Sequence, residues 1–500
     1  MNFKNCRRDS YLTSSELISA LFINTPLTED VVLVTYVKVI TTLEYSLVFQ
    51  YSALTTNFHL FFYCHSATSY CLLDGDKVPK LIACCALVVL NLVVLLLSVS
   101  VSQIEMSEAL NTAVSAANND FTKDVYWNLA ANKKENAIIS PFSLHVVLGL
   151  ASFGAAGSTA EAMMKGLRIK HSETLLKDYK GIIDQLSKSP ELKIANKIYF
   201  AKDIELNPAY QTQAVDNFNS ELGKVDFSQP PAAAKEMNDW VSNHTNDKIK
   251  DLIKADSLDA STKLVLINAI HFKGKWTVPF KPEATKDGPF YLDDTNSVQV
   301  PLMFVKDSFY MYEEAGEDGF KMLELPYGSK DEQHFSMHIF LPNKRDGLAS
   351  LEEKLFKHSE SFAEKFGNIV KSTFKTEVEV TLPRFKIEST WEMNDLCKKL
   401  GMEVAFSSNA DFSLMTKNKE PLLISEVIQK AFIEVNEEGT EAAAATAVMW
   451  VLRCMRMPEP EDPVRFTADH PFWIIICDVN QRIVFISKVT KLDSVGFTQN

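Results

Sequence analysis

Residues 437–446, which combine a flexible start with a run of very small side chains, are the first feature of this chain that could do chemistry. If the run is extended, its side chains alternate between two faces, and Thr440, Ala442, Ala444 and Thr446 share one of them. That face is uncharged, so the segment could enter an existing β-sheet at little desolvation cost. A short alanine-rich helix that Thr440 caps fits these residues equally well when they are taken alone.

The sequence before this run favours the mobile, extended alternative. Residues 427–435 are rich in β-branched side chains and partly alternating, so they predict a strand that leads directly to Gly439. A bulky segment that ends in Arg453 follows. The combination predicts a flexible arm between two strands, with an arginine near its far end.

Composition restricts the classes of function. The chain has 500 residues, of which 46% are hydrophobic and 23% charged, as in globular proteins. A net charge of -13 argues against nucleic-acid binding, and the scattered Lys165, Lys170, Lys177 and Lys180 indicate solvated helix faces more than a polyanion site. There is no nucleophile elbow, His-Glu-x-x-His pair or phosphate-binding glycine loop, so we expect neither an enzyme nor a cofactor.

The cysteines predict neither a disulfide framework nor a zinc site. Five of the eight precede residue 86, namely Cys6, Cys64, Cys71, Cys84 and Cys85. The other three are too few and too far apart for either role. We expect Cys397 and Cys477 to be buried thiols and Cys454 to lie in the exposed arm.

Residues 81–102 form a mainly apolar run that follows Lys77 and Lys80 and ends in small residues. This pattern indicates a signal peptide that begins unusually late, or a signal anchor. Both alternatives place the residues that follow outside the cytosol, and we expect a secreted protein that contacts a membrane only if 81–102 remain as an anchor. Residues 1–80 are interpreted as an extension that the mature protein lacks.

The globular part is predicted to span 107–492 as one large domain, because no linker or internal repeat divides it. Helices prevail early and strands late, which is typical of an α+β fold. Helical patterns occupy 121–129, 141–150, the stretch that begins at 158–161, and 240–253; strand patterns occupy 136–140, 192–200, 264–272, 378–382, 472–479 and 482–489. The last two strands are expected to form a closing hairpin, and 264–272 to be covered on both faces.

Many of these segments together resemble the serpins. The arm over 436–446 is similar to the serpin hinge, and the segments that continue the resemblance, in the same order as in that family, are 136–167, 195–200, 268–276, 382–386, 400–402, 410–413 and 468–472. The resemblance covers residues 108–491. It implies helices around a large central β-sheet with two further sheets, and an exposed reactive-centre loop over about 437–463.

The resemblance also implies a mechanism and its residues. Counted from Gly439, the bond that a protease cleaves joins Arg453 to Cys454, and Arg453 suits a trypsin-like serine protease. The cleaved loop is expected to insert into the main sheet and trap that protease as a covalent 1:1 complex with a monomeric inhibitor. The expected hinge comprises Glu437, Gly439, Thr440, Glu441, Ala442, Ala443, Ala444, Ala445 and Thr446, and the polar residues where the central strands part are Ser140, Ser143, Asn268, Trp276 and Gln429.

Several alternatives stay open. Gln429 stands where serpins usually have histidine, and Ser487 where they usually have glycine. Arg456 could serve as the bait in place of Arg453, in an Arg-x-x-Arg pattern that furin-like proteases accept. A non-inhibitory carrier or chaperone, or a membrane-tethered adhesion protein, are the competing functions. Asn243 begins a glycosylation sequon.

Overall fold

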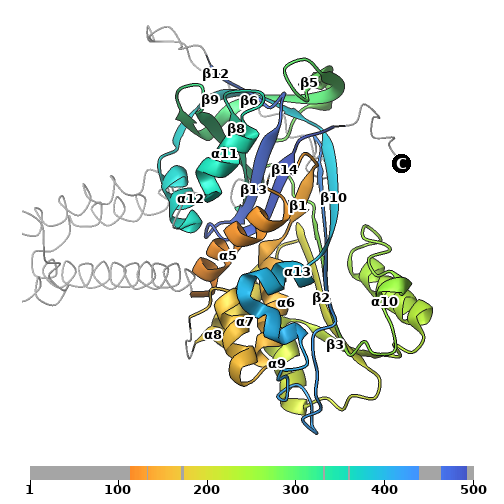
Figure 1. Ribbon diagram of the computed structural model, residues 1–500. Helices are drawn as coiled ribbons and strands as arrows, with labels where there is room; N and C mark the ends of the chain where they lie inside the picture. Colours follow the sequence, from red (N-terminus) through yellow and green to blue (C-terminus); the bar gives the residue numbers. More distant parts are fainter. Residues whose placement is uncertain are drawn as a thin grey trace, which may run out of the picture. The chain divides into compact units, whose positions relative to one another are not determined.

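The structure is a computed structural model, and it describes residues 113–131, 133–170, 174–329, 333–357, 361–437 and 463–492. The fold is α+β, with helices in the first half and strands in the second, as expected (Figure 1). The main helices are α5 (Ala113–Leu129), α6 (Pro141–Phe153), α7 (Gly157–Gly166), α8 (Leu175–Ser187), α9 (Pro208–Phe218), α10 (Pro230–His244), α11 (Leu348–Glu352), α12 (Phe362–Lys371) and α13 (Asn394–Cys397).

One sheet of five strands contains the strand that precedes the predicted arm. Its order is β10-β11-β4-β2-β3, formed by β10 (Phe385–Glu392), β11 (Glu426–Val435), β4 (Leu264–Phe272), β2 (Leu192–Ala201) and β3 (Glu221–Val225). The pairs β10·β11 and β4·β2 are antiparallel, whereas β11·β4 and β2·β3 are parallel. Every residue of β4 is buried, which confirms the prediction of a strand covered on both faces.

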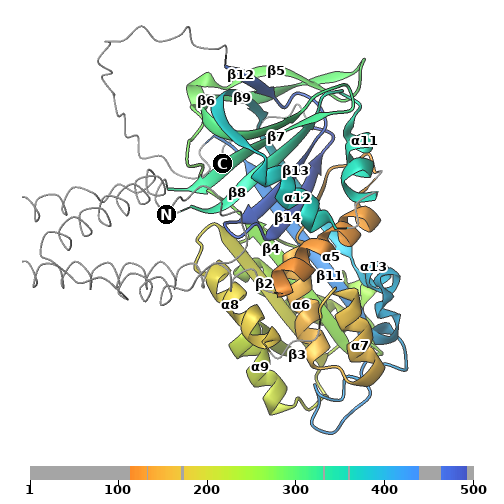
Figure 2. The same cartoon turned by 90° about the vertical axis from the view of Figure 1, so that its left-hand side faces the viewer.

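Helices cover both faces of this sheet. The helix α6 packs on β2 and β4, and it lies in front of the sheet in Figure 2 together with α5 and α8. Ser140 caps α6 by accepting from the amide of Ser143, and Pro141 occupies the first turn, where its missing N–H costs nothing. The helix α10 lies on the opposite face, as Figure 1 shows.

The second sheet contains nine strands in the described part of the chain. It is formed by β1 (Ala137–Ile139), β5 (Lys286–Tyr291), β6 (Ser297–Glu314), β7 (Phe320–Gly328), β8 (Gln333–Pro342), β9 (Phe374–Pro383), β12 (Val464–Thr467), β13 (Phe472–Asp478) and β14 (Ile483–Val489). The long strand β6 pairs with β5 and β9 along its first part and with β7 at its end. The two further sheets that we expected are therefore continuous through β6.

Most predicted elements are confirmed, and two need correction. The closing hairpin β13–β14 is present, and Val378, Val380 and Leu382 of β9 are buried in alternation with more exposed neighbours. The first helix starts earlier than predicted, at Ala113, because Val114 and Ala117 extend the buried stripe of Phe121 by helical spacing. No described helix is long and apolar enough to span a bilayer; residues 81–102 lie outside the described part.

The helix predicted over 240–253 is wrong beyond His244. The helix α10 instead runs over Pro230–His244 and ends there. Asn246, Asp247 and Asp251 adopt left-handed backbone angles, with φ of 51°, 58° and 53°. Asparagine and aspartate tolerate this region better than other side chains, and it is incompatible with a right-handed helix. The segment after α10 is therefore irregular.

Candidate functional site

The shared edge of β4 and β11, called the seam below, is the point in the sheet closest to the predicted arm. The two strands pair in parallel from Glu426 opposite Val265 to Ile433 opposite Phe272. The strand β11 ends at Val435, two residues before Glu437, where the described chain stops until residue 463. The arm therefore leaves the sheet at one end of the seam.

A buried polar cluster lies against the inner face of the seam. Gln429 donates from Nε2 to the carbonyl of Ser140 at 2.8 Å, and its Oε1 accepts from the amide of Ser140 at 3.0 Å. Nε2 of Gln429 also donates to Oδ1 of Asn268, which lies opposite Gln429 in the register. Asn268 donates in turn to the hydroxyl of Ser143. These four side chains are fully buried, so Gln429 serves as both donor and acceptor between the two strands.

Asn196 on β2 completes this cluster, and the sequence prediction missed it. Its Oδ1 accepts from Asn268 and, at 3.3 Å, from the hydroxyl of Ser143. Asn196 pairs with Asn268 across β2 and β4. An amide at an inward position of an otherwise apolar strand was the signal that could have found it. The seam cluster is defined as Ser140, Ser143, Asn196, Asn268 and Gln429.

Trp276 lies away from this cluster, at the end of the seam where the arm departs. Its indole Nε1 donates to the carbonyl of Asn436 at 2.9 Å, and its ring stacks on Tyr327 with centroids 4.2 Å apart. The amide of Phe280 donates to the carbonyl of Glu437 at 3.1 Å. The structure thus separates the five predicted polar residues into a group of four and one anchor at the end of the seam.

The carboxylate of Glu437 anchors the first residue of the predicted hinge. It accepts from Nη2 of Arg384, which the sequence prediction missed, and from the hydroxyl of Thr285 at 2.7 Å. Burial alone would raise the pKa of Glu437, but the hydrogen bonds from Arg384 and Thr285 outweigh burial and lower it. Glu437 is therefore charged at neutral pH, and its ion pair fixes where the arm begins.

The outer face of the seam carries an aromatic pair. His271 of β4 lies opposite Phe432 of β11 in the register, and their ring centroids are 5.2 Å apart. Nε2 of His271 is buried and has no hydrogen-bond partner. Burial, together with the nearby positive charges of Lys248 and Lys273, lowers the pKa of His271 to about 4. His271 is therefore neutral at physiological pH.

The remaining predicted site residues are less central or not described. Asn243 is exposed in the last turn of α10, whereas Thr245 of the same sequon is buried and donates to the carbonyl of Val241. Cys397 and Cys477 are free and buried, as expected. Within the described ranges no group of His, Cys, Asp or Glu could hold a metal ion. Outside those ranges lie Gly439, Thr440, Glu441, Ala442, Ala443, Ala444, Ala445, Thr446, Arg453, Cys454 and Arg456.

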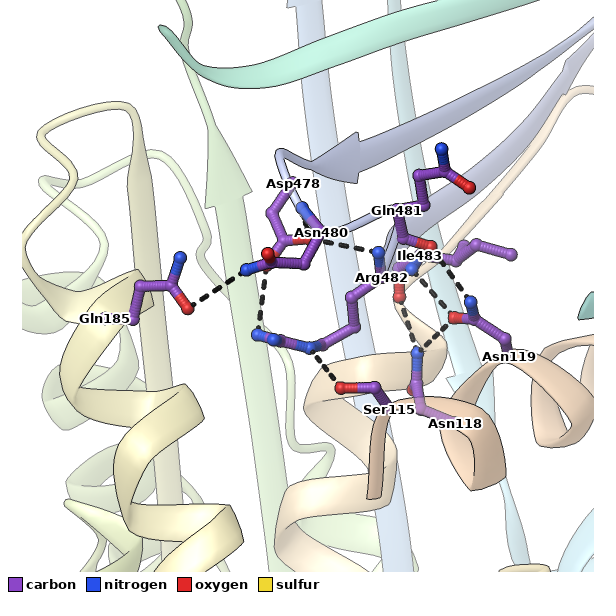
Figure 3. A network of polar contacts seen from close by, with 9 residues as sticks. All are labelled: Ser115, Asn118, Asn119, Gln185, Asp478, Asn480, Gln481, Arg482 and Ile483. Atoms are coloured by element: carbon purple, nitrogen blue, oxygen red, sulfur yellow. Dashed lines mark hydrogen bonds and ion pairs between the residues drawn. The ribbon is translucent and has the colours of Figure 1, made fainter. Parts of the chain in front are cut away.

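A second polar cluster, at the turn of the β13–β14 hairpin, was not predicted. Arg482 is fully buried, and its Nη1 lies 3.0 Å from Oδ2 of Asp478. Figure 3 shows its guanidinium between Asp478 and Ser115 of α5, to whose hydroxyl Nε donates at 3.0 Å. Asn119 of α5 donates to the carbonyl of Gln481 at 2.9 Å. These contacts, called the hairpin clamp, join the turn to α5.

The comparisons with known proteins agree with this geometry. The family model described as serpin (serine protease inhibitor) matches residues 116–492. Antichymotrypsin-2 of Bombyx mori is 34% identical over 366 residues, which cover 73% of this chain and 94% of that protein; Serpin-Z1C of Triticum aestivum is 37% identical over 370 residues, which cover 71% and 90%. The crystal structure of Serpin48, a highly specific serpin of the insect Tenebrio molitor, aligns with a TM-score of 0.65 at 36% identity and covers 77% of this chain and 99% of its own.

The chain belongs to the serpins, a family of serine protease inhibitors.

Proposed function

We propose that this chain inhibits trypsin-like serine proteases as a suicide substrate, with Arg453 as the bait residue. The observation that carries the proposal is the parallel pairing of β4 and β11. The arm leaves β11 at the end of the seam. If the arm folded back between the two strands, it would run antiparallel to both. An added strand with antiparallel neighbours on both sides forms well-aligned hydrogen bonds with each of them. Because the added strand would be antiparallel to β11, a short hairpin turn suffices to connect the two.

The proposed reaction begins as ordinary proteolysis. The protease serine attacks the carbonyl carbon of Arg453, the bond to the nitrogen of Cys454 breaks, and that nitrogen leaves as a protonated amine. The Arg453 carbonyl stays joined to the protease as an ester. The freed arm then inserts into the seam and moves the protease by roughly 50 Å, if some fourteen residues extend at strand rise. Distortion of the protease site stops hydrolysis of the ester. Inhibition therefore requires that the arm inserts faster than water hydrolyses the ester.

The residues of the arm support insertion. Thr440, Ala442, Ala444 and Thr446 would point to one side of the inserted strand, and none carries a charge. Their small size suits a position above the tightly packed seam cluster. A charge in that row would be buried without a partner at a cost of several kcal/mol. A non-inhibitory carrier has no such requirement for its arm.

The experiment that tests the proposal is incubation of the chain with trypsin, followed by denaturing electrophoresis and mass spectrometry. We expect a complex that resists detergent and a released C-terminal fragment that begins at Cys454. A fragment that begins at Met457 would move the bait to Arg456. Cleavage without any complex would contradict inhibition and favour the carrier function.

Thr440→Arg provides the matched variant. The arginine would have to enter the sheet, so we expect insertion to become slower than hydrolysis of the ester. The variant should therefore still be cleaved but should no longer form the trapped complex. Glu441→Arg is the control, because residue 441 points to the other face of the extended arm. If Thr440→Arg inhibits as well as the natural chain, the arm does not insert as proposed.

We also propose that residues 81–102 direct the chain into the secretory pathway and that residues 1–80 are absent from the mature protein. Sequencing of the N-terminus of the protein recovered from the medium of expressing eukaryotic cells tests this proposal. A start shortly after residue 102 is the expected result, and residues 1–80 on the mature chain would contradict it.

A further inference from the structure

A groove of about 500 Å³ lies beside the hairpin clamp, between α5, α12 and the turn of the β13–β14 hairpin. The two helices pack side by side, as Figure 2 shows. Ala116 and Asn119 of α5 line the groove, together with residues of α12 from Ala363 to Lys371 and with the turn residues 479–481. One water molecule requires roughly 10–15 Å³, so the groove has room for several side chains.

Small residues on α12 keep this groove open. Ala363 and Gly367 are four residues apart, so they share one face of the helix. A β-carbon added at Gly367 would have Oε1 of Gln481 as its nearest neighbour, at 3.8 Å, which is an ordinary contact distance. Alanine would therefore fit at this position and is the better helix former. The effect of Gly367 is to leave the space between α12 and the turn unfilled.

An apolar side chain and a positive charge at the groove are both left uncovered. Val479 at the turn is 59% exposed, although it is a large apolar residue. Lys371, in the last turn of α12, forms no ion pair with any residue of the described ranges. Glu364 lies in the first turn of α12, seven residues earlier and hence roughly 10 Å away along the helix axis. The groove thus suits an occupant that is partly apolar and partly acidic.

The chain itself supplies such an occupant in the residues that lead into α5. The described part of the chain starts at Ala113, three residues before Ala116, which lines the groove. Residues 103–112, called the lead segment, precede it and lie outside the described ranges. Ten extended residues reach at most about 33–36 Å, whereas the axes of packed helices are about 8–10 Å apart. The lead segment is therefore attached beside the groove and is long enough to cross it.

The composition of the lead segment complements the groove. It contains three large apolar residues and two acidic residues, and no lysine or arginine: Ile104, Met106 and Leu110, with Glu105 and Glu108. The apolar residues gain from covering Val479 and the small face of α12, because apolar surface is removed from water. The acidic residues gain from a position beside Lys371, and no cation in the segment opposes this.

We propose that residues 103–112 dock in this groove and cover the hairpin clamp in the mature protein. The inference takes up the proposed processing after residue 102, which gives the lead segment a free end, and it is independent of the bait residue and of strand insertion. Concave sites with an apolar lining and a few polar groups are the places where small molecules bind. Docking of the lead segment would close this groove to them.

Photo-cross-linking of the secreted chain tests the docking. The full chain is expressed in eukaryotic cells with p-benzoylphenylalanine in place of Met106, irradiated, digested and analysed by mass spectrometry. We expect cross-links to residues 363–371 or 479–481 of the same molecule. The same photoreactive group in place of Asn128, which is exposed in the last turn of α5, should form none of them. Absence of these cross-links from position 106 would overturn the proposal, as would cross-links that join two molecules.

Gly367→Phe is the variant that fills the groove. Its ring would occupy the space of the lead segment, so we expect the yield of these cross-links to fall roughly tenfold or more. Gly367→Ala is the matched control and should keep the yield within twofold, because its β-carbon makes only an ordinary contact. Both substitutions replace the weaker helix former, and thermal unfolding of the two variants checks that they fold. Equal yields in the two variants would contradict docking at this groove.

Lys371→Glu tests the charge. It would repel the acidic residues of the lead segment, so the yield of cross-links should fall severalfold. Lys357→Glu is the control, because Lys357 pairs with Glu353 at 3.1 Å and does not line the groove. An unchanged yield in Lys371→Glu would show that the lead segment does not lie beside this lysine.

Sequencing of the N-terminus of the same sample separates docking from processing. If the chain begins shortly after residue 102 and forms no cross-link, the docking fails alone. If residues 1–80 remain and the cross-links form, the processing fails and the docking stands. A chain that begins beyond Met106 lacks most of the lead segment and would overturn the docking. If cross-links are absent and 1-anilinonaphthalene-8-sulfonate binds the natural chain but not Gly367→Phe, the groove is an open small-molecule site and the proposal is wrong.

Discussion

The seam cluster and the hairpin clamp are both buried polar networks, but they differ in charge. The seam cluster consists of hydroxyls and amides between β4, β11, β2 and α6. The hairpin clamp is built around a fully buried arginine and its aspartate. Separating a neutral hydrogen bond costs about 0.5–1.5 kcal/mol, whereas a buried charge that loses its partner costs about 3–5 kcal/mol.

This difference matches what each region has to do. The strands at the seam have to separate for insertion, and neutral groups can re-form hydrogen bonds with the incoming backbone at low cost. The turn at the clamp does not have to move: the ion pair lies within the hairpin, and hydrogen bonds from Arg482 to Ser115 and from Asn119 to Gln481 tie the turn to α5. The comparison indicates that a buried ion pair suits the static hairpin turn, whereas neutral hydrogen-bonding groups suit the inner face of the seam, where the strands have to separate.

The largest expected effect comes from breaking the clamp with Asp478→Asn. The amide oxygen can still accept from the amides of Asn480 and Arg482, but the charge that compensates Arg482 is lost. We expect the free energy of unfolding to fall by about 3–5 kcal/mol, measured by urea denaturation. Uptake of a synthetic peptide with the sequence of residues 440–452, followed on native gels as a measure of strand insertion at the seam, should stay within twofold, because the clamp does not open during insertion.

Asp395→Asn is the control for charge removal at the surface. Asp395 pairs with Lys398 at 3.8 Å, and its side chain is 90% exposed, so the loss should be at most about 1 kcal/mol. Equal losses in Asp395→Asn and Asp478→Asn would contradict the role of the clamp.

Asn268→Ala tests the seam cluster and should have an intermediate effect. It removes the acceptor of Gln429 and the donor to Ser143 and Asn196. We expect a loss of about 1–3 kcal/mol in the free energy of unfolding, together with faster peptide uptake. The matched variant at the clamp is Asn480→Ala, which should leave uptake unchanged. Destabilisation without faster uptake would show that the cluster does not restrain opening.

The smallest effect concerns pH and His271, the titratable side chain at the aromatic pair of the seam. It faces Phe432 of β11, Lys193 lies opposite it on β2, and Lys248 and Lys273 contribute positive charge nearby. Burial and the nearby lysines lower the pKa of His271 in the closed seam to about 4. Neutral His271 therefore stabilises the closed seam relative to the open one above pH 6.5, and this stabilisation is lost as the pH falls from 6.5 toward 4.

Peptide uptake should therefore be faster at pH 5 than at pH 7.5. Part of this acceleration should disappear in His271→Phe, which keeps the aromatic pair without a titratable group. The comparison between variants is needed because burial also lowers the pKa of His145 to about 4, and His145 lies outside the seam. An identical pH dependence in His271→Phe and the natural chain would exclude His271 as the group responsible.

The sequence was sufficient for the order of elements and for most of the seam cluster. Apolar runs and alternation placed β4, β9, β11 and the hairpin, and the serpin resemblance placed Ser140, Ser143, Asn268 and Gln429 together. Asn196, Arg384 and the hairpin clamp were missed. Their partners are distant in the chain, so no local pattern reveals that Arg384 meets Glu437 or that Arg482 is buried against Ser115.

The irregular segment after α10 illustrates a different limit. Residues 240–253 have the spacing of an amphipathic helix, but contacts to Asn238 and Lys430 compete with helical hydrogen bonds and hold three residues at positive φ. Tertiary contacts overrode a local preference at this point.

The parallel pairing of β4 with β11 also has a consequence during biosynthesis. β4 leaves the ribosome long before β11, and at 5–20 residues per second the delay is on the order of ten seconds or more. Throughout this delay the nascent sheet presents a vacant β4 edge, which another molecule's strand could occupy. Crowded polysomes therefore pose a greater hazard of domain-swapped assembly to this protein than dilute storage of the finished chain does.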